Sequence, residues 1–255
     1  MNTIQPRKQL IFNNTKSSIN NLERLQEISN QLNPHFGSSC WNKHSMVTMN
    51  VGALSKLLYL NDLYQRIIDV PGVICEFGVQ WGTTLTHLIN LRSIYEPFNC
   101  SRVVYGFDTF EGFTNIHSND GTLPRENDLT TLENYENILE ETLTLIESFP
   151  PLSHLKKFEL IKGDATHTVD SWLEDNPHVV ISMAIFDMDL YTPTKEVIKK
   201  IKPRLIKGSL LVFDELNCKH FPGETLAVLE ELGLNNLKLR KNQFQPFAAF
   251  AVYGE

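Results

Sequence analysis

The feature that most constrains this chain is a short apolar run that ends near an acid and is followed by two glycines. Residues 74 to 82 read Ile-Cys-Glu-Phe-Gly-Val-Gln-Trp-Gly, which places Glu76, Gly78 and Gly82 at the end of the run. A second run, Val-Val-Tyr-Gly-Phe-Asp, ends at Asp108. Strands buried on both faces of a parallel sheet are continuously apolar, and ligands bind beyond their carboxyl ends. The pattern predicts an α/β fold that holds a nucleotide-like ligand at these strand ends.

Strands and helices alternate along the rest of the chain. Strands are predicted at residues 73–77, 102–107, 157–162, 179–186, 209–213, 236–241 and 247–253. Helices are predicted at residues 50–69, 83–91, 192–201 and 223–232. Thr192 is the expected cap of the third helix, with Pro193 at its first position. Such alternation predicts a doubly wound, mostly parallel, seven-stranded, Rossmann-like sheet, with the last two strands as a hairpin at its edge.

The chain is expected to have two parts. Residues 1–70 form an N-terminal helical segment that begins loosely, with one short helix expected from the spacing of Leu22, Leu25 and Ile28, and residues 71–255 form the ligand-binding domain. One connection in that domain, residues 113–156, is far longer than usual. Thr130 and Glu133 have the spacing of a capping box that opens a helix reaching to about residue 146.

Seven acids and no Lys or Arg lie between Glu126 and Glu147, within the long connection. One interpretation is a solvated acidic helix. The other is a lid over the strand ends that shapes a substrate pocket, because long insertions at this position usually serve binding. Both interpretations stay open at this point.

Composition excludes several classes of protein. The formal net charge is −7 and the pI is near 5.6, so no nucleic-acid partner is expected. The four cysteines show no metal-binding spacing. No signal-like start and no apolar run of membrane-spanning length is present, and we expect a soluble cytoplasmic protein without a membrane partner.

Acids follow each predicted parallel strand, and their chemistry suggests the ligand. The glycines lack the Gly-x-Gly-x-x-Gly spacing that places a pyrophosphate at a helix N-terminus. S-adenosylmethionine has no phosphate: its ammonium suits Glu76, its carboxylate suits Thr83, and its ribose hydroxyls suit Asp108. Asp164 is expected to meet the adenine amino group or an adjacent backbone site.

Four further motifs occur in order along the chain. They are Glu-x-Gly-Val-x-x-Gly from Glu76, Gly-Phe-Asp-Thr-Phe-Glu-Gly-Phe around Asp108, Asp-x-Asp-Leu-Tyr-x-x-Thr from Asp187, and Pro-x-Leu-x-x-Gly-Ser before Phe-Asp-Glu. Together they resemble the macrocin and mycinamicin type of sugar O-methyltransferase over residues 50–233. The resemblance implies a class I methyltransferase fold with S-adenosylmethionine as the methyl donor. Thr109 and Phe110 lie within the second motif and are expected at the cofactor.

The resemblance also implies Mg²⁺, held by acids after the fourth and fifth strands. Here these are Asp187 (or Asp189), Asp214 and Glu215. Mg²⁺ prefers carboxylate oxygens, and when bound to vicinal sugar hydroxyls it would lower the pKa of one of them. Asp187 or Asp189 is also a candidate for the base that takes the hydroxyl proton. Glu215 departs from the family, which usually has a second aspartate there.

Three loop histidines, His117, His167 and His220, are weaker candidates for a general base. His220 is the best of them because it follows the acid pair closely, although a loop histidine is more often a surface residue. Trp81 and Phe110 are either walls of the cofactor site or core aromatics, and Tyr191 is expected on the pocket floor.

The leading hypothesis is therefore an S-adenosylmethionine-dependent O-methyltransferase acting on a small-molecule hydroxyl, that of a sugar, in glycan or natural-product biosynthesis. A nucleotide-dependent oxidoreductase on the same kind of sheet is one alternative. A non-catalytic module that binds S-adenosylmethionine is another. A homo-oligomer is expected.

Overall fold

The computed structural model describes residues 16–255, which divide into two compact units at Lys56 and Leu57. In the first unit, α2 (Lys16–Leu32) is followed by the 3-10 turn η1 (Asn33–His35), the short helix α3 (Trp41–Ser45) and the turn η2 (Met46–Thr48). Helix α4 (Val51–Gln65) begins in this unit and continues into the second. The helix expected around residues 22–28 is thus present and longer than predicted.

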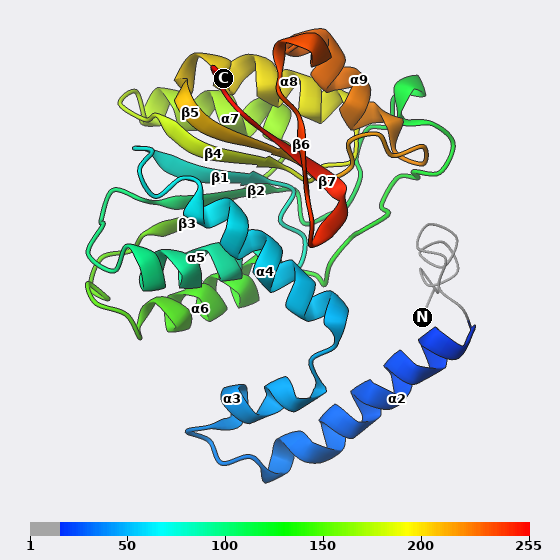
Figure 1. Cartoon of the computed structure of the whole chain (residues 1–255), viewed down its shortest axis with the longest axis vertical. Coiled ribbons are helices and arrows are strands. Elements are labelled where there is room, and N and C mark those ends of the chain that lie inside the picture. The colour runs from blue at the N-terminus through cyan, green and yellow to red at the C-terminus, as the bar shows by residue number, and fades with distance from the viewer. Residues whose placement is uncertain (1–15) are drawn as a thin grey trace. The chain divides into compact units, whose positions relative to one another are not determined.

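The second unit is built on one sheet (Figure 1). Within the described residues the sheet has seven strands in the order β3-β2-β1-β4-β5-β7-β6. Its strands are β1 (Val73–Phe77), β2 (Val104–Asp108), β3 (Phe158–Lys162), β4 (Ile181–Phe186), β5 (Leu205–Phe213), β6 (Arg240–Asn242) and β7 (Gln245–Val252). The first five strands pair in parallel, and β7 and β6 form an antiparallel edge. The predicted doubly wound sheet with a terminal hairpin is confirmed.

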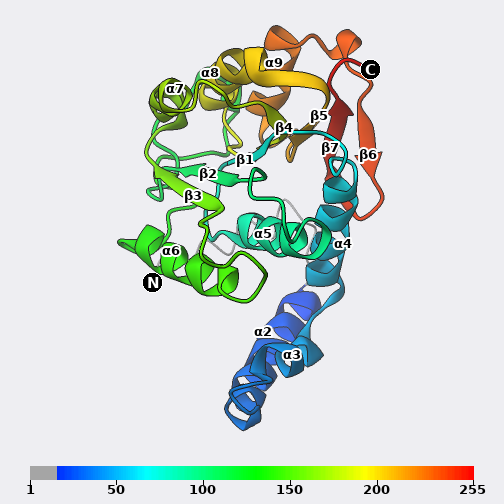
Figure 2. The same cartoon turned by 90° about the vertical axis from the view of Figure 1, so that its left-hand side faces the viewer.

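Helices cover both faces of the sheet (Figure 2). On one face lie α4, α5 (Thr83–Tyr95) and α6 (Tyr135–Glu147), with one apolar cluster beneath them. On the other lie α7 (Ala165–Asp175), α8 (Tyr191–Ile201) and α9 (Pro222–Glu231), over a second cluster. Alternation of side chains along each strand sends neighbouring residues into different clusters, such as Ile74 and Cys75. Both faces are therefore dry, which explains the uninterrupted apolar runs in the sequence.

Three local predictions differ from the structure. The capping box of Thr130 and Glu133 does not open a helix, because α6 begins after Asn134, whose φ is 57°. Helix α8 starts at Tyr191, so Thr192 is not its cap. Helix α7, which was not predicted, follows β3 and is capped by the side chain of Asp164.

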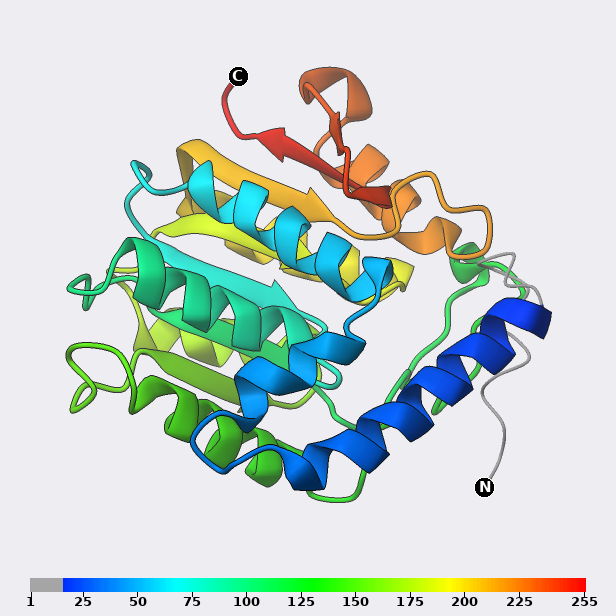
Figure 3. The same ribbon diagram turned by 60° about the horizontal axis from the view of Figure 1, so that its bottom comes forward.

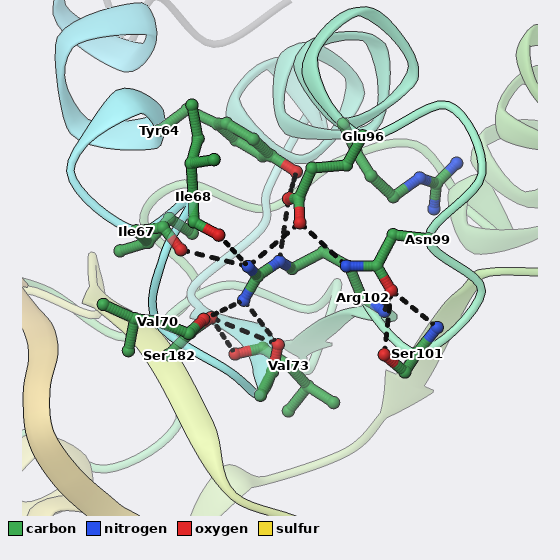
Figure 4. A network of polar contacts seen from close by, with 12 residues as sticks. Tyr64, Ile67, Ile68, Val70, Val73, Glu96, Asn99, Ser101, Arg102 and Ser182 are labelled. Carbon is green, nitrogen blue, oxygen red and sulfur yellow. Dashed lines mark hydrogen bonds and ion pairs between the residues drawn. The ribbon is translucent and has the colours of Figure 1, made fainter.

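A buried arginine joins the loops at the amino ends of the strands (Figure 4). Arg102, 2% exposed, donates to the carbonyl oxygens of Ile67 (3.0 Å), Val70 (2.8 Å) and Gly72 (2.7 Å). Its Nε also donates to Glu96 at 2.9 Å. Five fixed N–H donors suit this task, since a planar guanidinium can satisfy several carbonyl groups at once. The network fixes the entry into β1, and through it the position of the glycine loop at the other end of that strand.

Candidate functional site

The carboxyl ends of the parallel strands meet at one edge of the sheet, and the arrows of these parallel strands point toward it in Figure 3, opposite to the red arrow of β7. Backbone hydrogen bonds continue the ladder one residue past the strands. Gly78 N–H donates to Phe107 (2.9 Å), Asp187 N–H to Phe77 (2.8 Å) and Asp214 N–H to Phe186 (3.1 Å). The residues that follow β1, β4 and β5 are therefore held in register.

Phenylalanines form a rigid layer below this edge. The ring of Phe77 stacks on Phe107 at 4.8 Å and on Phe186 at 5.7 Å, and Phe186 stacks on Phe213 at 5.4 Å. These rings point into the cluster under α7, α8 and α9. The side chains one position later, Asp187 and Asp214, point toward the opposite face. The strand ends thus present polar groups on a packed apolar base.

The glycine loop is fixed by close contacts on two sides. Gly78 has a φ of 95°, and a Cβ on it would lie 1.9 Å from the carbonyl oxygen of Asp187. Gly82 has a φ of 73°, and its Cβ would lie 2.5 Å from Leu139 of α6. Only glycine fits at position 78, because a Cβ there would meet backbone atoms, whereas a Cβ at position 82 would be strained and would displace the end of the Leu139 side chain. The two glycines therefore join the loop to β4 and to α6.

Asp108 binds the same loop through its carboxylate. One oxygen accepts from the N–H groups of Val79 (2.6 Å) and Gln80 (2.7 Å), and the other accepts from Phe110 N–H (2.6 Å). A carboxylate offers about four acceptor positions, so three of them already hold protein donors. Asp108 thus orders the loops after β1 and β2 in addition to the ribose contact predicted for it.

The other cofactor candidates lie along the same edge. Glu76 is buried on β1 opposite Gly106. Thr83 is exposed at the start of α5, and the hydroxyl of Thr109 closes its own turn by donating to Gly112 (3.0 Å). Asp164 accepts from the N–H (2.8 Å) and the hydroxyl (2.7 Å) of Thr166.

Two aromatic candidates differ in exposure. Phe110 is buried in the core beside Tyr135. Of the two alternatives given for Phe110, cofactor wall or core aromatic, its burial favours the second. Trp81 is 45% exposed, and its ring meets the Tyr135 ring edge-on at 4.9 Å. Tyr135 also donates its hydroxyl to the Trp81 carbonyl oxygen at 3.1 Å. Of the two, only Trp81 presents a ring at the surface of this edge.

A second group of side chains, which we call the acid corner, follows β4 and β5. It consists of Asp187, Asp189, Asp214, Glu215 and Glu224. Asp189 is buried with a φ of 61°, and Glu224 in the first turn of α9 is fully buried. Glu224 accepts from Glu215 N–H at 2.9 Å. Neither the Glu215 Oε2 atom nor the Glu224 Oε2 atom has a hydrogen-bond partner in the described part of the chain.

Burial and mutual repulsion change the acidity of this corner. Burial, with a smaller contribution from Asp214, raises the pKa of Glu215 to about 7. Burial raises the pKa of Glu224 well above its ordinary value, and the charges of Asp214, Asp189 and Asp187 act in the same direction. The pKa of Tyr59 on α4 is raised by burial and then by Asp214, Asp187 and Glu224. The charges of Asp214 and Asp187 therefore raise the pKa of Tyr59 on one side of the sheet and that of Glu224 on the other.

The acid corner has the donor chemistry of a hard divalent cation, with buried carboxylate oxygens that lack partners. Among residues 16–255, however, no three or more His, Cys, Asp or Glu side chains are already grouped so that they hold a metal ion. Nearby acids disfavour one another's charged forms, and the raised pKa values of Glu215 and Glu224 are in part a result of this effect. The residues fit the metal chemically without forming a preset cage.

The long connection is anchored beside this corner. Asp120, fully buried, accepts from Tyr191 N–H at the start of α8 (2.6 Å) and from His117 N–H (2.7 Å). Tyr191 is buried, and its hydroxyl donates to Glu230 of α9 at 2.6 Å; its position on a pocket floor stays a prediction. His220 lies exposed on the loop before α9.

Sequence reasoning missed three residues here: Tyr59, Asp120 and Glu224. A Tyr in an apolar helix stripe and an Asp after Asn in a polar turn resemble ordinary structural residues. An acid in the first turn of a helix is common, because it is stabilised by the helix dipole, so Glu224 also resembles an ordinary structural residue. The one available signal was that Glu224 follows the Asp-Glu pair closely in the sequence.

Comparison with known proteins decides the family. The family model described as macrocin-O-methyltransferase (TylF) matches residues 7–227. The chain belongs to the macrocin-O-methyltransferase family. A crystal structure of CalS11, a calicheamicin methyltransferase, is 34% identical to it with a TM-score of 0.90, and the match covers 95% of each chain. A search of curated proteins found no match.

Two further structures agree on the fold. An apo structure of CalS11, described as a TDP-rhamnose 3'-O-methyltransferase, is 33% identical with a TM-score of 0.82, over 95% of this chain and 96% of that one. The O-methyltransferase NovP is 16% identical with a TM-score of 0.56, over 78% of this chain and 79% of that one, and shares the fold.

The macrocin-O-methyltransferase family assignment confirms the resemblance seen in the sequence. The protein is an S-adenosylmethionine-dependent O-methyltransferase with a class I fold, and the comparisons support neither the oxidoreductase nor the non-catalytic module. No helix among residues 16–255 is both long and apolar enough to cross a membrane.

Proposed function

We propose that this methyltransferase acts on a sugar hydroxyl in glycan or natural-product biosynthesis, with a nucleoside diphosphate sugar as the leading acceptor class. One observation carries the proposal. The relative described as a TDP-rhamnose 3'-O-methyltransferase shares 33% identity with this chain over almost the full length of both.

The cofactor half of the site is proposed at the ends of β1, β2 and β3. Glu76 receives the ammonium of S-adenosylmethionine, and the loop from Gly78 to Thr83 receives its carboxylate. Asp108 accepts one ribose hydroxyl with its remaining acceptor position while it holds the loop. Thr109, Phe110 and Asp164 position the segments that border the ribose and adenine.

The acceptor half is proposed at the acid corner. Methyl transfer is an in-line displacement in which the acceptor oxygen attacks the sulfonium methyl group. Holding these two atoms in contact supplies much of the rate enhancement. Asp187 takes the hydroxyl proton as general base, because it follows β4 directly beside the glycine loop. Asp189 shapes this segment, and His220 is a second candidate for proton transfer.

Mg²⁺ is proposed as a second cofactor, with Asp187, Asp214 and Glu215 as its ligands. When bound, the cation supplies charge stabilisation to the developing alkoxide. Glu215 reaches one methylene further than an aspartate, and its Oε2 atom is buried without a hydrogen-bond partner among the described residues. This orphaned oxygen supports Glu215 as a ligand despite the departure from the family pattern.

The long connection, residues 113–156, is proposed to border the acceptor, within a domain spanning residues 71–255 that follows a helical segment at residues 1–70. Asp120 supports this proposal because it anchors the connection at the end of β4. Residues of the connection then determine which acceptors fit.

A homo-oligomer is proposed for the working enzyme, with no nucleic-acid or membrane partner and with a cytoplasmic location. Four exposed apolar side chains support self-association: Ile94, Phe98, Leu145 and Phe149. Ile94 lies on α5 and Leu145 on α6, and an ion pair between Arg92 and Glu147 joins these two helices near their C-terminal ends. The net charge of −7 disfavours nucleic acid.

Methyl transfer from donor-labelled S-adenosylmethionine to a panel of nucleoside diphosphate sugars and glycosides tests the acceptor class. Each reaction is run with Mg²⁺ and with a chelator. We expect label in a sugar of the panel and a loss of rate on chelation. Labelling only of non-sugar hydroxyls, such as catechols, would overturn the sugar proposal, and rates unaffected by chelation would overturn the metal.

A further inference from the structure

Glu224 is a buried acid in which only one of the two carboxyl oxygens has a hydrogen-bond partner among the described residues. It lies in the first turn of α9 with 0% of its surface exposed. Its Oε1 atom accepts from Glu215 N–H at 2.9 Å. Its Oε2 atom, also buried, has no hydrogen-bond partner in the described part of the chain. A buried polar atom without a partner is rare and calls for an explanation.

Packing places this carboxyl group between the two strand ends that carry the acids. The preceding Gly223 has no room for a side chain, since a Cβ would lie 2.5 Å from Tyr191 N and 3.1 Å from the Leu190 carbonyl carbon. The first turn of α9 therefore lies against the segment that follows β4. The bond to Glu215 N–H ties the same turn to the segment that follows β5.

A purely structural role does not require an acid at this position. The bond to Glu215 needs one carbonyl-type oxygen, which glutamine also offers. A carboxyl group instead adds a second oxygen next to Asp214, Asp189 and Asp187, whose negative charges all reach it. The charged form of a carboxyl group buried among other acids is unfavourable, which raises the pKa of Glu224, and a cation among these acids would offset that cost.

We infer that Glu224 is an additional ligand of the divalent cation, completing with Asp187, Asp214 and Glu215 a site that closes only around the metal. This inference rests on the proposed Mg²⁺ cofactor. Mg²⁺ and Mn²⁺ take carboxylate oxygens, and the Oε2 atom of Glu224 is the one buried oxygen on α9 that the structure leaves for this purpose among the described residues. Among residues 16–255 no three such side chains are already grouped to hold a cation, so the inferred site requires the acid side chains to move together on binding.

Binding of Mn²⁺, measured by electron paramagnetic resonance of the free ion, tests the inference on the full chain without using turnover. The proteins compared are the wild type, Glu224→Gln, Asp214→Asn and, as a matched control, Glu231→Gln at the half-buried last position of the same helix. We expect Glu224→Gln to weaken Mn²⁺ binding by about tenfold or more and Glu231→Gln to leave it unchanged.

Thermal unfolding of the cation-free proteins separates a ligand from a structural residue. Glu224→Gln keeps the acceptor for Glu215 N–H and removes one repelling acid, so we expect its Tm to stay the same or to rise by about 2–4 °C. A structural role predicts the opposite, a lower Tm with unchanged Mn²⁺ affinity. Glu224→Asp shortens the side chain by one methylene and so withdraws the carboxylate from the site. We expect this second variant to fold and to bind Mn²⁺ more weakly than the wild type.

The outcomes distinguish this inference from the proposal beneath it. Wild-type affinity in Glu224→Gln, together with a loss in Asp214→Asn, would remove Glu224 from the site and leave the cation in place. No Mn²⁺ binding by the wild type would remove both.

Discussion

Gly78 and the backbone of Asp187 meet so closely that only glycine fits at position 78: a Cβ there would lie 1.9 Å from the Asp187 carbonyl oxygen. This contact joins the cofactor loop to the proposed catalytic base. In the proposed site, the separation between methyl donor and acceptor would therefore depend on backbone atoms at the ends of two adjacent strands, β1 and β4.

Replacing Gly78 with alanine should damage both halves of the site. The substitution forces a methyl group into a carbonyl oxygen at a φ of 95°. We expect a loss of about 2–4 kcal/mol in the free energy of unfolding and loss of S-adenosylhomocysteine binding, measured by denaturant titration and calorimetry. Gly37→Ala is the control, because a Cβ there meets nothing within 4 Å. Equal stability of the two variants would contradict the argument.

Asp108→Asn should weaken the hydrogen bonds that order the glycine loop without creating a cavity in the apolar core. Asparagine keeps one acceptor oxygen, whereas Asp108 uses both oxygens for three N–H donors at 2.6–2.7 Å. Hydrogen bonds to charged groups contribute about 1.5–3 kcal/mol each, so we expect a 10- to 100-fold weaker Kd for S-adenosylhomocysteine. Calorimetry measures it, with Asp175→Asn at an exposed position as control. Unchanged affinity would show that the loop is ordered by other contacts.

The sequence predicted those parts of the site that strand periodicity controls. Glu76 and Asp108 were predicted because each lies at the end of an apolar run. Parallel pairing brings the ends of such strands to one edge of the sheet, independently of how the helices pack. Residues carried by helices were not predicted. The position of Glu224 depends on how α9 packs on the β4 loop through Gly223, a contact between segments far apart in the chain.

Local signals failed where tertiary packing offered a better alternative. Thr130 and Glu133 have capping-box spacing, yet α6 starts at Tyr135, where Tyr135 meets Trp81 and Leu139 meets Gly82. These contacts outweigh the roughly 1 kcal/mol that a cap contributes. Asp164 was interpreted as a ligand residue, and a helix after it was overlooked, because one acid at a strand end fits both roles.

Arg102→Met should destabilise the fold and spare the chemistry. The guanidinium lies among carbonyl groups and Glu96 at the amino ends of the strands, at the edge opposite to the site (Figure 4). Removing one partner of a buried ion pair costs about 3–5 kcal/mol, which denaturant unfolding measures. KM for S-adenosylmethionine should stay within about twofold of wild type at a temperature where the variant is folded. Arg66→Met, which breaks an exposed pair with Asp62, is the control, with an expected loss below about 1 kcal/mol.

Asp187→Asn should stop turnover and leave cofactor binding intact. The amide cannot accept the hydroxyl proton, and loss of a general base lowers kcat by about 10²–10⁴-fold. Single-turnover transfer of labelled methyl groups measures the chemical step, and calorimetry with S-adenosylhomocysteine measures binding. If binding were lost while the chemical step survived at saturating donor, Asp187 would belong to the cofactor half of the site.

The pKa of Glu215 gives the enzyme a pH-dependent stability that a variant can remove. Burial raises this pKa from its usual value of 4.5 to about 7, so between these pH values the folded chain binds a proton that the unfolded chain has released. Stability contributed by this proton is complete below about pH 4.5 and is lost as the pH rises through 7. In the absence of cations, the free energy of unfolding should fall by up to about 3 kcal/mol from pH 5 to pH 8.

Glu215→Gln should flatten this dependence and be more stable than the wild type at pH 8, because glutamine needs no proton when buried. Glu224 shifts in the same direction and leaves a residual slope in the variant. Added Mg²⁺ should restore wild-type stability at pH 8, where the ionised carboxylates repel one another most, and should act less on Glu215→Gln. Thermal unfolding at pH 5, 6.5 and 8, with and without Mg²⁺, measures all three effects. A wild-type slope in Glu215→Gln would place the titrating group elsewhere in the acid corner.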